Sequence, residues 1–343
     1  MNIKIKKDRA IGDSNPCYII MDVGANHNGN LETAIDLIKF AAENGADAIK
    51  FQTYTAEGLY SKMTPKFSKD PTTPFEMIQK YQHPREWLTT LIETANKHQI
   101  DFSSSPFDYE AVDLLDRLNV PFYKIASPEI VNLDLIEYVA KKQKPVILST
   151  GMATIEEIQD AIDVILKSNN EKIILLHCNV MYPSPAEIVN LRAMETMKKV
   201  FKYPIGFSDH TLGIHISLAA VSLGAKVIEK HFTLDKTQPG PDHNFALEPS
   251  ELKQLVEKIR EIERSMGDGI KQPNELELKE NYKLARPSII AAKDIPKGTI
   301  ITREMLVIKR PGFGIKPKFI DKVIGRRAKE NIEQDNWITW DLL

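Results

Sequence analysis

The chain has 343 residues and a formal net charge of −2, with 42% hydrophobic and 27% charged residues. These values are typical of a folded globular protein, and the balanced charge provides no basic field for nucleic acid. No apolar run approaches the ~18 residues that span a bilayer, and residues 1–15 lack the apolar core of a secretory signal. Cys17 and Cys178 lie inside apolar runs, which predicts buried thiols rather than a disulfide. We therefore expect a cytoplasmic protein that binds neither nucleic acid nor a membrane.

Eight short apolar runs recur along the chain, separated by segments of helical periodicity. Their near-continuous hydrophobicity is typical of parallel strands that are buried on both faces. The helical segments carry the usual end signals: 30–45 stops at Gly45, and 154–170 starts with Thr154 and Glu157 at the spacing of a capping box. The expected strands cover residues 17–24, 48–54, 101–106, 122–127, 145–150, 172–179, 204–210 and 226–232.

Eight strands, each followed by a helix, are the number found in a (β/α)8 barrel. An open, doubly wound sheet shows the same alternation and is the alternative fold. Barrel enzymes build their active sites at the C-terminal ends of the strands. Polar residues stand at or near all eight of these ends, which favours a catalytic barrel: Asp22, Lys50, Gln52, Ser105, Lys124, Ser127, Ser149, Asn179, His210 and His231.

Two lysines near strand ends indicate an anionic ligand. Burying Lys50 and Lys124 is costly unless negative groups surround them. With several serine hydroxyls as neighbouring donors, the ring suits a small anion that carries a carboxylate and a phosphate. An alternative, compatible with the first, is that the lysines pair with internal carboxylates such as Asp22 or Glu129.

Two histidines, His210 and His231, end the last two expected strands. Neighbouring strand ends bring such side chains into one space, and a pair of imidazoles with open positions suits a divalent ion completed by water and substrate oxygens. His83, by contrast, lies in a polar stretch and is expected at the surface.

An ordered set of short motifs covers nearly the whole chain: MDVGANHNG, KFQTY, SSPFD, YKIAS, ILSTGM, LLHC, SDHT, EKHFTLDK and GPDH. This set resembles the sialic acid synthase family. The resemblance implies an enzyme that joins phosphoenolpyruvate to an N-acetylmannosamine-type sugar, releases phosphate and forms a nonulosonic acid such as sialic or legionaminic acid. One departure is Asp22, where the family usually has Glu.

The resemblance also implies roles for individual residues. The phosphoenolpyruvate anchors would be Lys50, Ser105, Lys124, Ser127, Ser149, Asn179 and Ser208. The catalytic group would be Asp22, Gln52 and Glu129, and the sugar contacts would be Asn26, Tyr182, Asp242 and Arg310. His210 and His231 would bind a divalent metal, manganese in the first place, with magnesium or cobalt as alternatives.

The family architecture implies a barrel over residues 1–266, a linker over 267–285 and a small antifreeze-like (SAF) domain over 286–343. It also implies a domain-swapped homodimer, in which Arg310 of one chain reaches the barrel of the other. Two other functions remain open on this scaffold. One is a metal-dependent aldolase or related sugar-phosphate synthase, and the other is a non-catalytic sugar-binding protein.

The segment 55–82 is much longer than the other connections that follow a strand. Long loops after barrel strands lie on the catalytic face and are often lids or binding loops. We therefore predict that 55–82 is a lid, with a helical decoration away from the site as the alternative.

Overall fold

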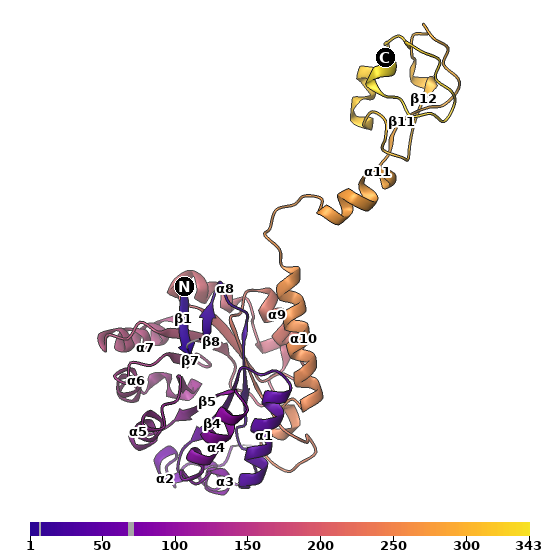
Figure 1. The fold of residues 1–343 in the computed structure, drawn as a ribbon. Helices are drawn as coiled ribbons and strands as arrows, with labels where there is room; N and C mark the ends of the chain where they lie inside the picture. Colours follow the sequence, from indigo (N-terminus) through magenta and orange to yellow (C-terminus); the bar gives the residue numbers. More distant parts are fainter. Residues whose placement is uncertain (7, 68–71) are drawn as a thin grey trace. The chain divides into compact units, whose positions relative to one another are not determined.

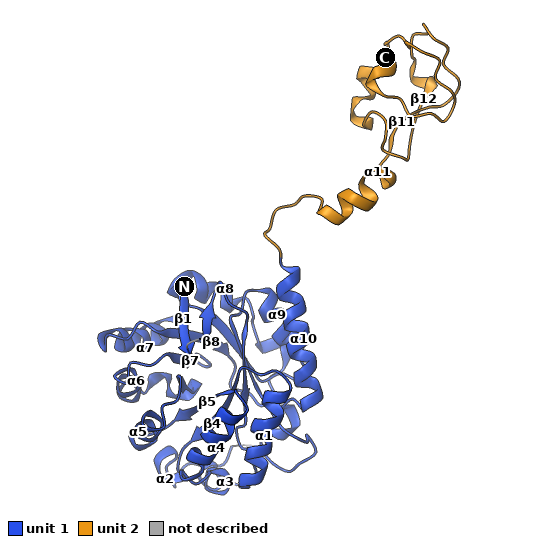
Figure 2. Ribbon diagram, viewed as in Figure 1, with its two compact units in different colours: residues 1–266 blue, residues 267–343 orange. Residues whose placement is uncertain are grey.

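The structure, a computed structural model that describes residues 1–6, 8–67 and 72–343, contains a barrel in which strands and helices alternate (Figure 1). The chain divides into two compact units, Met1–Met266 and Gly267–Leu343 (Figure 2). Each unit has a hydrophobic core of its own. In the described part of the chain, no helix is long and apolar enough to cross a membrane.

Eight parallel strands form the barrel of the first unit. The first of them, β3, pairs with both the second, β4, and the last, β10, and the order continues through consecutive neighbours to β6. An open doubly wound sheet would not pair its first strand with its last, so the predicted near-closed (β/α)8 barrel is confirmed. The strands are β3 (Tyr18–Asp22), β4 (Ala48–Thr53), β5 (Asp101–Pro106), β6 (Tyr123–Ile125), β7 (Val146–Ser149), β8 (Ile173–Cys178), β9 (Ile205–Asp209) and β10 (Val227–His231).

A helix follows each barrel strand and covers the outside of the sheet. The sequence sets their starts: Asn30 caps the first helix through the backbone N–H of Thr33, and Thr154 and Glu157 form the predicted capping box. The outer helices are α1 (Leu31–Glu43), α4 (Trp87–Lys97), α5 (Tyr109–Arg117), α6 (Leu133–Ala140), α7 (Ile155–Lys167), α8 (Ala193–Phe201), α9 (His215–Ser222) and α10 (Pro249–Ser265).

The inside of the barrel changes from apolar to polar along most of the strands. Side chains two positions apart face the same side of a strand, so Ile20 is followed by Asp22, and Val227 by Glu229 and then His231. The apolar members of this series form one buried cluster: Tyr18, Ile20, Ala48, Phe122, Ile147, Ile174, Leu176 and Val227. The polar members therefore gather at the C-terminal ends of the strands.

An antiparallel hairpin precedes the barrel and packs into its apolar end. Its strands are β1 (Asn2–Lys6) and β2 (Arg9–Gly12). Ile3, Ile5 and Ile11 belong to the same buried cluster as the apolar interior of the barrel. The hairpin, which the sequence interpretation did not include, thus completes the core at the end opposite to the polar residues.

The long connection after β4 carries two short helices, α2 (Ala56–Leu59) and α3 (Pro74–Tyr81). Thr73 and Glu76 form a capping box at the start of α3. The predicted lid 55–82 includes both helices, while its residues 68–71 lie outside the described residues.

The second unit is small and built mostly from turns. It contains a π-helical segment (Glu277–Asn281), α11 (Tyr282–Ala285), α12 (Ile320–Val323) and an antiparallel pair, β11 (Ser288–Ala291) with β12 (Leu306–Lys309). Aliphatic residues such as Ile289, Ile301 and Ile338 form its core.

Candidate active site

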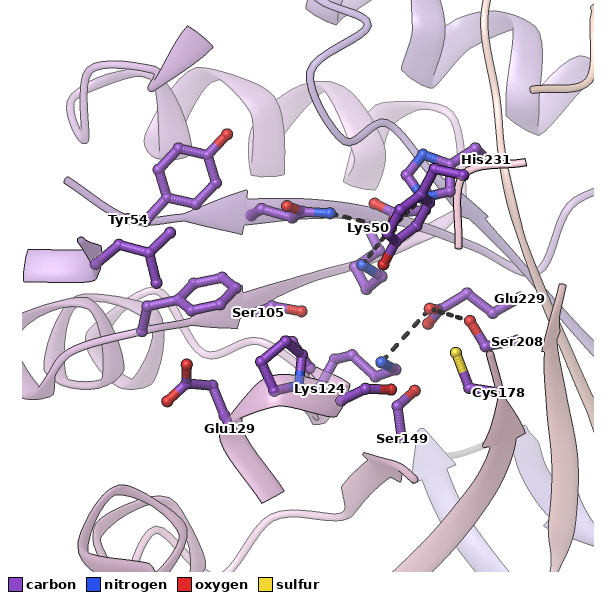
Figure 3. A pocket seen from close by; sticks show the side chains of 18 of the residues that line it. Lys50, Tyr54, Ser105, Lys124, Glu129, Ser149, Cys178, Ser208, Glu229 and His231 are labelled. Atoms are coloured by element: carbon purple, nitrogen blue, oxygen red, sulfur yellow. Dashed lines mark hydrogen bonds and ion pairs between the residues drawn. The ribbon is translucent and has the colours of Figure 1, made fainter. Parts of the chain in front are cut away.

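A cavity opens where the polar ends of the barrel strands converge (Figure 3). Most of the predicted site residues line it, and they come from all eight barrel strands or the segments that follow them. The predicted residues in the lining are Asp22, Lys50, Gln52, Ser105, Lys124, Ser127, Glu129, Ser149, Tyr182, Ser208, His210 and His231.

Two predicted site residues, Asn179 and Asn26, donate their side-chain hydrogen bonds to backbone carbonyls outside the cavity. The Asn179 side-chain amide donates to the carbonyl of Ile188 at 3.0 Å. The Asn26 amide donates to the carbonyl of Phe232 at 2.9 Å. Neither residue is part of the cavity lining. The Asn26 amide joins the loops after β3 and β10, and the Asn179 amide bridges two points of the connection after β8.

Asp242 lies beside one of the two histidines. Its Oδ2 accepts the backbone N–H of Ala25 at 2.8 Å and is 3.8 Å from Nδ1 of His231. Arg310 belongs to the second unit, where it is exposed and directly follows β12.

Lys50 and Asp22 form a buried ion pair, with Nζ and Oδ2 2.7 Å apart. Asp22 also accepts hydrogen bonds from Gln52 and from the backbone N–H of Gly24. Burial alone would raise the pKa of Asp22, but Lys50 and His231 outweigh it and hold the pKa well below its usual range. Asp22 is therefore an ionised carboxylate at neutral pH.

Lys124 pairs with Glu229, with a distance of 3.4 Å between Nζ and Oε1. The same carboxylate accepts a hydrogen bond from the Ser208 hydroxyl at 3.1 Å. Burial lowers the pKa of Lys124, and Glu229 only partly opposes this effect. The pKa of Lys124 therefore lies below its ordinary value, so this side chain loses its proton at a lower pH than a free lysine would.

His210 and His231 lie together, with ring centroids 5.4 Å apart. Nδ1 of His210 is 2.7 Å from the carbonyl oxygen of Asn179, and a carbonyl only accepts. This nitrogen therefore carries the proton, which leaves Nε2 of His210 free to act as a ligand. Nδ1 of His231 is buried without a hydrogen-bond partner among the described residues.

A glycine is required next to this histidine pair. Gly24 has a φ of +49°, and a Cβ there would lie 2.4 Å from Oδ2 of Asp242 and 2.9 Å from the His231 ring. A larger residue would be strained in the left-handed backbone conformation, and its Cβ would displace the side chains of Asp242 and His231.

Comparison of the sequence with protein families shows to which family the chain belongs. The family model described as NeuB family matches residues 37–271, and the SAF domain model matches residues 286–343. The chain belongs to the NeuB family.

This NeuB-family chain is similar to relatives and structures along most of its length. It is 46% identical to the N,N'-diacetyllegionaminic acid synthase of Campylobacter jejuni, over 93% of this chain and 98% of the relative. It is 40% identical to the enzyme of the same name from Legionella pneumophila, over 99% and 98%. The crystal structure of N-acetylneuraminic acid synthetase from Leptospira borgpetersenii superposes with a TM-score of 0.74 at 36% identity, covering 82% of this chain and 95% of that one.

Glu229 is one site residue that the sequence interpretation missed, and Cys178, expected only as a buried thiol, also lines the cavity. The alternative that the lysines pair with internal carboxylates holds for Lys50 and Asp22, whereas Lys124 pairs with Glu229 and not with Glu129. The signal was available, because Glu229 stands two positions before His231 on one strand and must face the same way.

His83 was wrongly expected at the surface. The structure buries it to 5% exposure, with its ring stacked 6.1 Å from Trp87 and edge-on 5.8 Å from His27. The polar residues around it in sequence hid this packing.

Proposed function

We propose that this protein is a nonulosonic acid synthase that joins phosphoenolpyruvate to an N-acetylmannosamine-type sugar and releases phosphate. It is an enzyme of the sialic acid synthase type, since named synthases are 37–46% identical to it over nearly their full length. The observation that carries the proposal is the content of the barrel cavity: two buried ammonium groups and a set of serine hydroxyls.

The phosphoenolpyruvate end of the cavity is prepared for an anion. The hydroxyls of Ser105 and Ser149 are buried without a hydrogen-bond partner among the described residues, a state that a ligand would relieve. With Lys50 and Lys124, they offer donors to phosphate and carboxylate oxygens. Ser208, a further proposed anchor, lines the same cavity while its hydroxyl donates to Glu229. Ser127, whose hydroxyl accepts the N–H of Gly151 at 3.0 Å, and Asn179 complete the proposed anchors.

The histidine pair fits a divalent ion, for which we propose manganese, with magnesium or cobalt as alternatives. Among the described residues, no three His, Cys, Asp or Glu side chains form a ligand set, so water and substrate oxygens would fill the other positions of the ion. The ion would supply Lewis-acid polarisation of the sugar aldehyde. His210, oriented by the carbonyl of Asn179, and His231 would hold it.

The carboxylates divide the remaining work. Asp22 is tied to Lys50 and Gln52, so we assign to it and Gln52 the positioning of groups beside His231. Glu129 lines the cavity and has no ion-pair partner among the residues the structure describes; its carboxylate accepts only the amide of Asn132 at 2.9 Å. We assign proton transfer to Glu129 because its carboxylate lines the cavity and no cationic side chain among the described residues pairs with it.

The sugar would be held by Tyr182, Asn26, Asp242 and Arg310. The Tyr182 ring lies 4.5 Å from that of His210, next to the position proposed for the aldehyde. Arg310 would come from a second chain in a domain-swapped dimer. Its planar guanidinium suits the oxygens of an acetamido sugar.

Phosphate release tests the function directly. The protein is incubated with phosphoenolpyruvate, manganese and a panel of 2-acetamido-mannose sugars, and inorganic phosphate is measured. We expect release that depends on both the sugar and the metal. A panel without sugar-dependent release would overturn the proposal and favour an aldolase or a binding protein.

The metal site is tested separately by His210→Ala and His231→Ala. Loss of an outer partner of a ligand costs about 10–100-fold in metal affinity, so loss of a ligand is expected to cost more than about 100-fold. Manganese binding is measured by calorimetry or electron paramagnetic resonance, without substrate. His98→Ala is the control, because His98 lies outside the cavity. Unchanged manganese affinity in both variants would refute the assignment.

A further inference from the structure

A buried ion pair lies directly behind the two histidines of the site. Lys230 precedes His231 on β10, and Asp209, the last residue of β9, precedes His210. Because side chains alternate along a strand, Lys230 and Asp209 point out of the barrel where the histidines point in. Nζ and Oδ2 of the pair are 3.1 Å apart, and both side chains are fully buried. The pair is therefore separate from the cavity, and neither residue lines it.

The pair binds the backbone of the residue that follows His210. Oδ1 of Asp209 accepts the N–H of Thr211 at 2.8 Å, and Nζ of Lys230 donates to the carbonyl oxygen of Thr211 at 2.6 Å. Both backbone groups of Thr211 are thus bound to the pair. Since Lys230 belongs to the neighbouring strand, the link runs between the two strands that lead to the histidines.

The two histidines differ in what fixes their backbone. His231 is the last residue of β10 and is paired with Asp22 of β3. His210 follows the end of β9, and the pairing of β9 with β10 ends at Asp209 and Lys230. His210 therefore depends on contacts other than the strand ladder for its position relative to His231.

Other contacts of His210 lead to a different part of the barrel. Its carbonyl oxygen accepts the N–H of Ser184 at 2.8 Å, and its Nδ1 donates to the carbonyl of Asn179. These contacts tie His210 to the connection after β8. The bonds of Lys230 to Asp209 and Thr211 tie it to the strand of the other histidine.

Stability alone does not account for such a pair. Charges lose their hydration when they are buried, and uncharged residues of similar size often stabilise a protein equally well. Several charge-assisted hydrogen bonds do fix geometry, because each restricts direction as well as distance. Asp209 makes a third such bond, since its Oδ2 accepts the hydroxyl of Ser217 on α9 at 2.6 Å.

We propose that Asp209 and Lys230 are positioning residues of the metal site, which hold His210 at the spacing from His231 that a divalent ion needs. This inference rests on the proposed function. The two rings lie 5.4 Å apart, and metal–ligand distances vary by only about 0.2 Å. A shift of one histidine relative to the other therefore weakens binding of the ion before any substrate arrives.

The experiment removes both charges together, in the double variant Asp209→Asn with Lys230→Met. Side-chain sizes stay close to the original ones, and no buried charge is left without a partner. The new amide still accepts the N–H of Thr211, but the new thioether cannot donate to its carbonyl. We expect manganese affinity without substrate to fall about 10-fold, the lower end of the range for outer partners of a metal ligand.

Two further measurements separate positioning from general damage to the barrel. Phosphoenolpyruvate affinity, measured by calorimetry with a chelator present, should be unchanged in the double variant, because Lys50 and Lys124 lie on other strands. Equal losses of manganese and phosphoenolpyruvate affinity would contradict a positioning role. Ser217→Ala is the matched control: it removes a bond to the same carboxylate, leaves the link from Lys230 to Thr211, and should keep the wild-type manganese affinity.

The outcomes distinguish this inference from the proposed function. A folded double variant with wild-type manganese affinity would overturn the inference and leave the metal assignment standing. A wild-type chain that binds none of manganese, magnesium and cobalt would overturn the metal assignment and this inference with it.

Hydrogen exchange of the metal-free wild-type chain provides a test that requires no variant. If the pair holds the backbone after His210, the amide of Thr211 should exchange as slowly as the amides of β9. Exchange at the rate of an exposed loop would contradict the inference, and this result decides the matter even if the double variant does not fold.

Discussion

Gly24 controls the geometry of the histidine pair because two restraints act on it at once. Its backbone is left-handed, and the space that a Cβ would occupy is taken by Asp242 and His231. For Gly24→Ala we expect manganese affinity to fall at least about 10-fold, the range for disturbed outer partners of a ligand. Metal titration without substrate measures this.

Gly29→Ala provides the control for the backbone contribution. Gly29 also has a positive φ, +69°, but no atom lies within 4 Å of its Cβ position. Both variants therefore pay about 1–2 kcal/mol for a left-handed alanine, and Gly24→Ala alone disturbs the site. Equal metal affinities in the two variants would contradict this explanation.

The convergence of the polar strand ends could be predicted from the sequence, because the C-terminal ends of all barrel strands meet at one face of the barrel. The partners of those residues could not be predicted in the same way. Lys124 stands on β6 and Glu229 on β10, and their contact depends on side chains meeting across the barrel interior. The hydrogen bonds that the side-chain amides of Asn26 and Asn179 donate depend on loop geometry, which leaves no pattern in the sequence.

At the scale of elements, the hairpin β1–β2 is part of the barrel core. Ile11 is fully buried in the cluster that fills the apolar end of the barrel. Ile11→Ala should lower the free energy of unfolding of the barrel by about 2–5 kcal/mol, because it removes buried methyl groups and leaves a cavity. Equilibrium unfolding in urea measures this change.

Ile188→Ala is the control for the hairpin, since Ile188 is 43% exposed. Its replacement should change the free energy of unfolding by no more than about 0.5 kcal/mol. If Ile11→Ala were equally mild, the hairpin would be an appendage rather than a part of the core.

The segment 55–82 contributes Leu59, Tyr60, Met77 and Ile78 to the cavity, so its described residues are not a decoration away from the site. Its closure over the ligands remains a prediction. Phosphoenolpyruvate together with an acceptor sugar should slow proteolytic cleavage within 55–82 several-fold, because ordered segments are poor protease substrates. Cleavage at equal rates with and without both ligands would argue against a lid.

Most of the barrel strands were predictable because burial on both faces makes them apolar runs, although β5 is buried throughout and reads DFSSSP. The hairpin was not, since its strands contain four or five residues and only Ile3, Ile5 and Ile11 carry the buried pattern. Barrel closure was also beyond the sequence, because the alternation of strands and helices is the same in an open sheet.

At the scale of the whole molecule, the two units carry opposite charge. Residues 1–266 contain 30 Lys and Arg against 36 Asp and Glu, a net −6, and residues 267–343 contain 15 against 11, a net +4. Opposite net charges favour association of such units, which supports the proposed exchange of second units between two chains. Arg310 is exposed and available for it.

Mixing two inactive variants tests this exchange. Arg310→Ala and His231→Ala are each expected to lose most activity. After mixing and reassembly, about a quarter of wild-type activity should return, because half of the dimers are mixed and each of these has one intact site. Lys316→Ala, at another exposed cation of the second unit, replaces Arg310→Ala in the control and should be active without mixing. If nothing returns while the chains exchange, Arg310 acts within its own chain or has no role.

In the two buried ion pairs, carboxylates of the protein compete with an anionic ligand for the lysines of the cavity. Any anion that binds Lys50 or Lys124 competes with Asp22 or Glu229 for the same ammonium group. Its affinity is therefore a difference between two strong interactions rather than the strength of one. The same competition works in reverse when phosphate departs, since the carboxylates stand ready to reclaim the lysines. The competition weakens binding of the anion and favours its release, which suits a chain that must empty its barrel after every turnover.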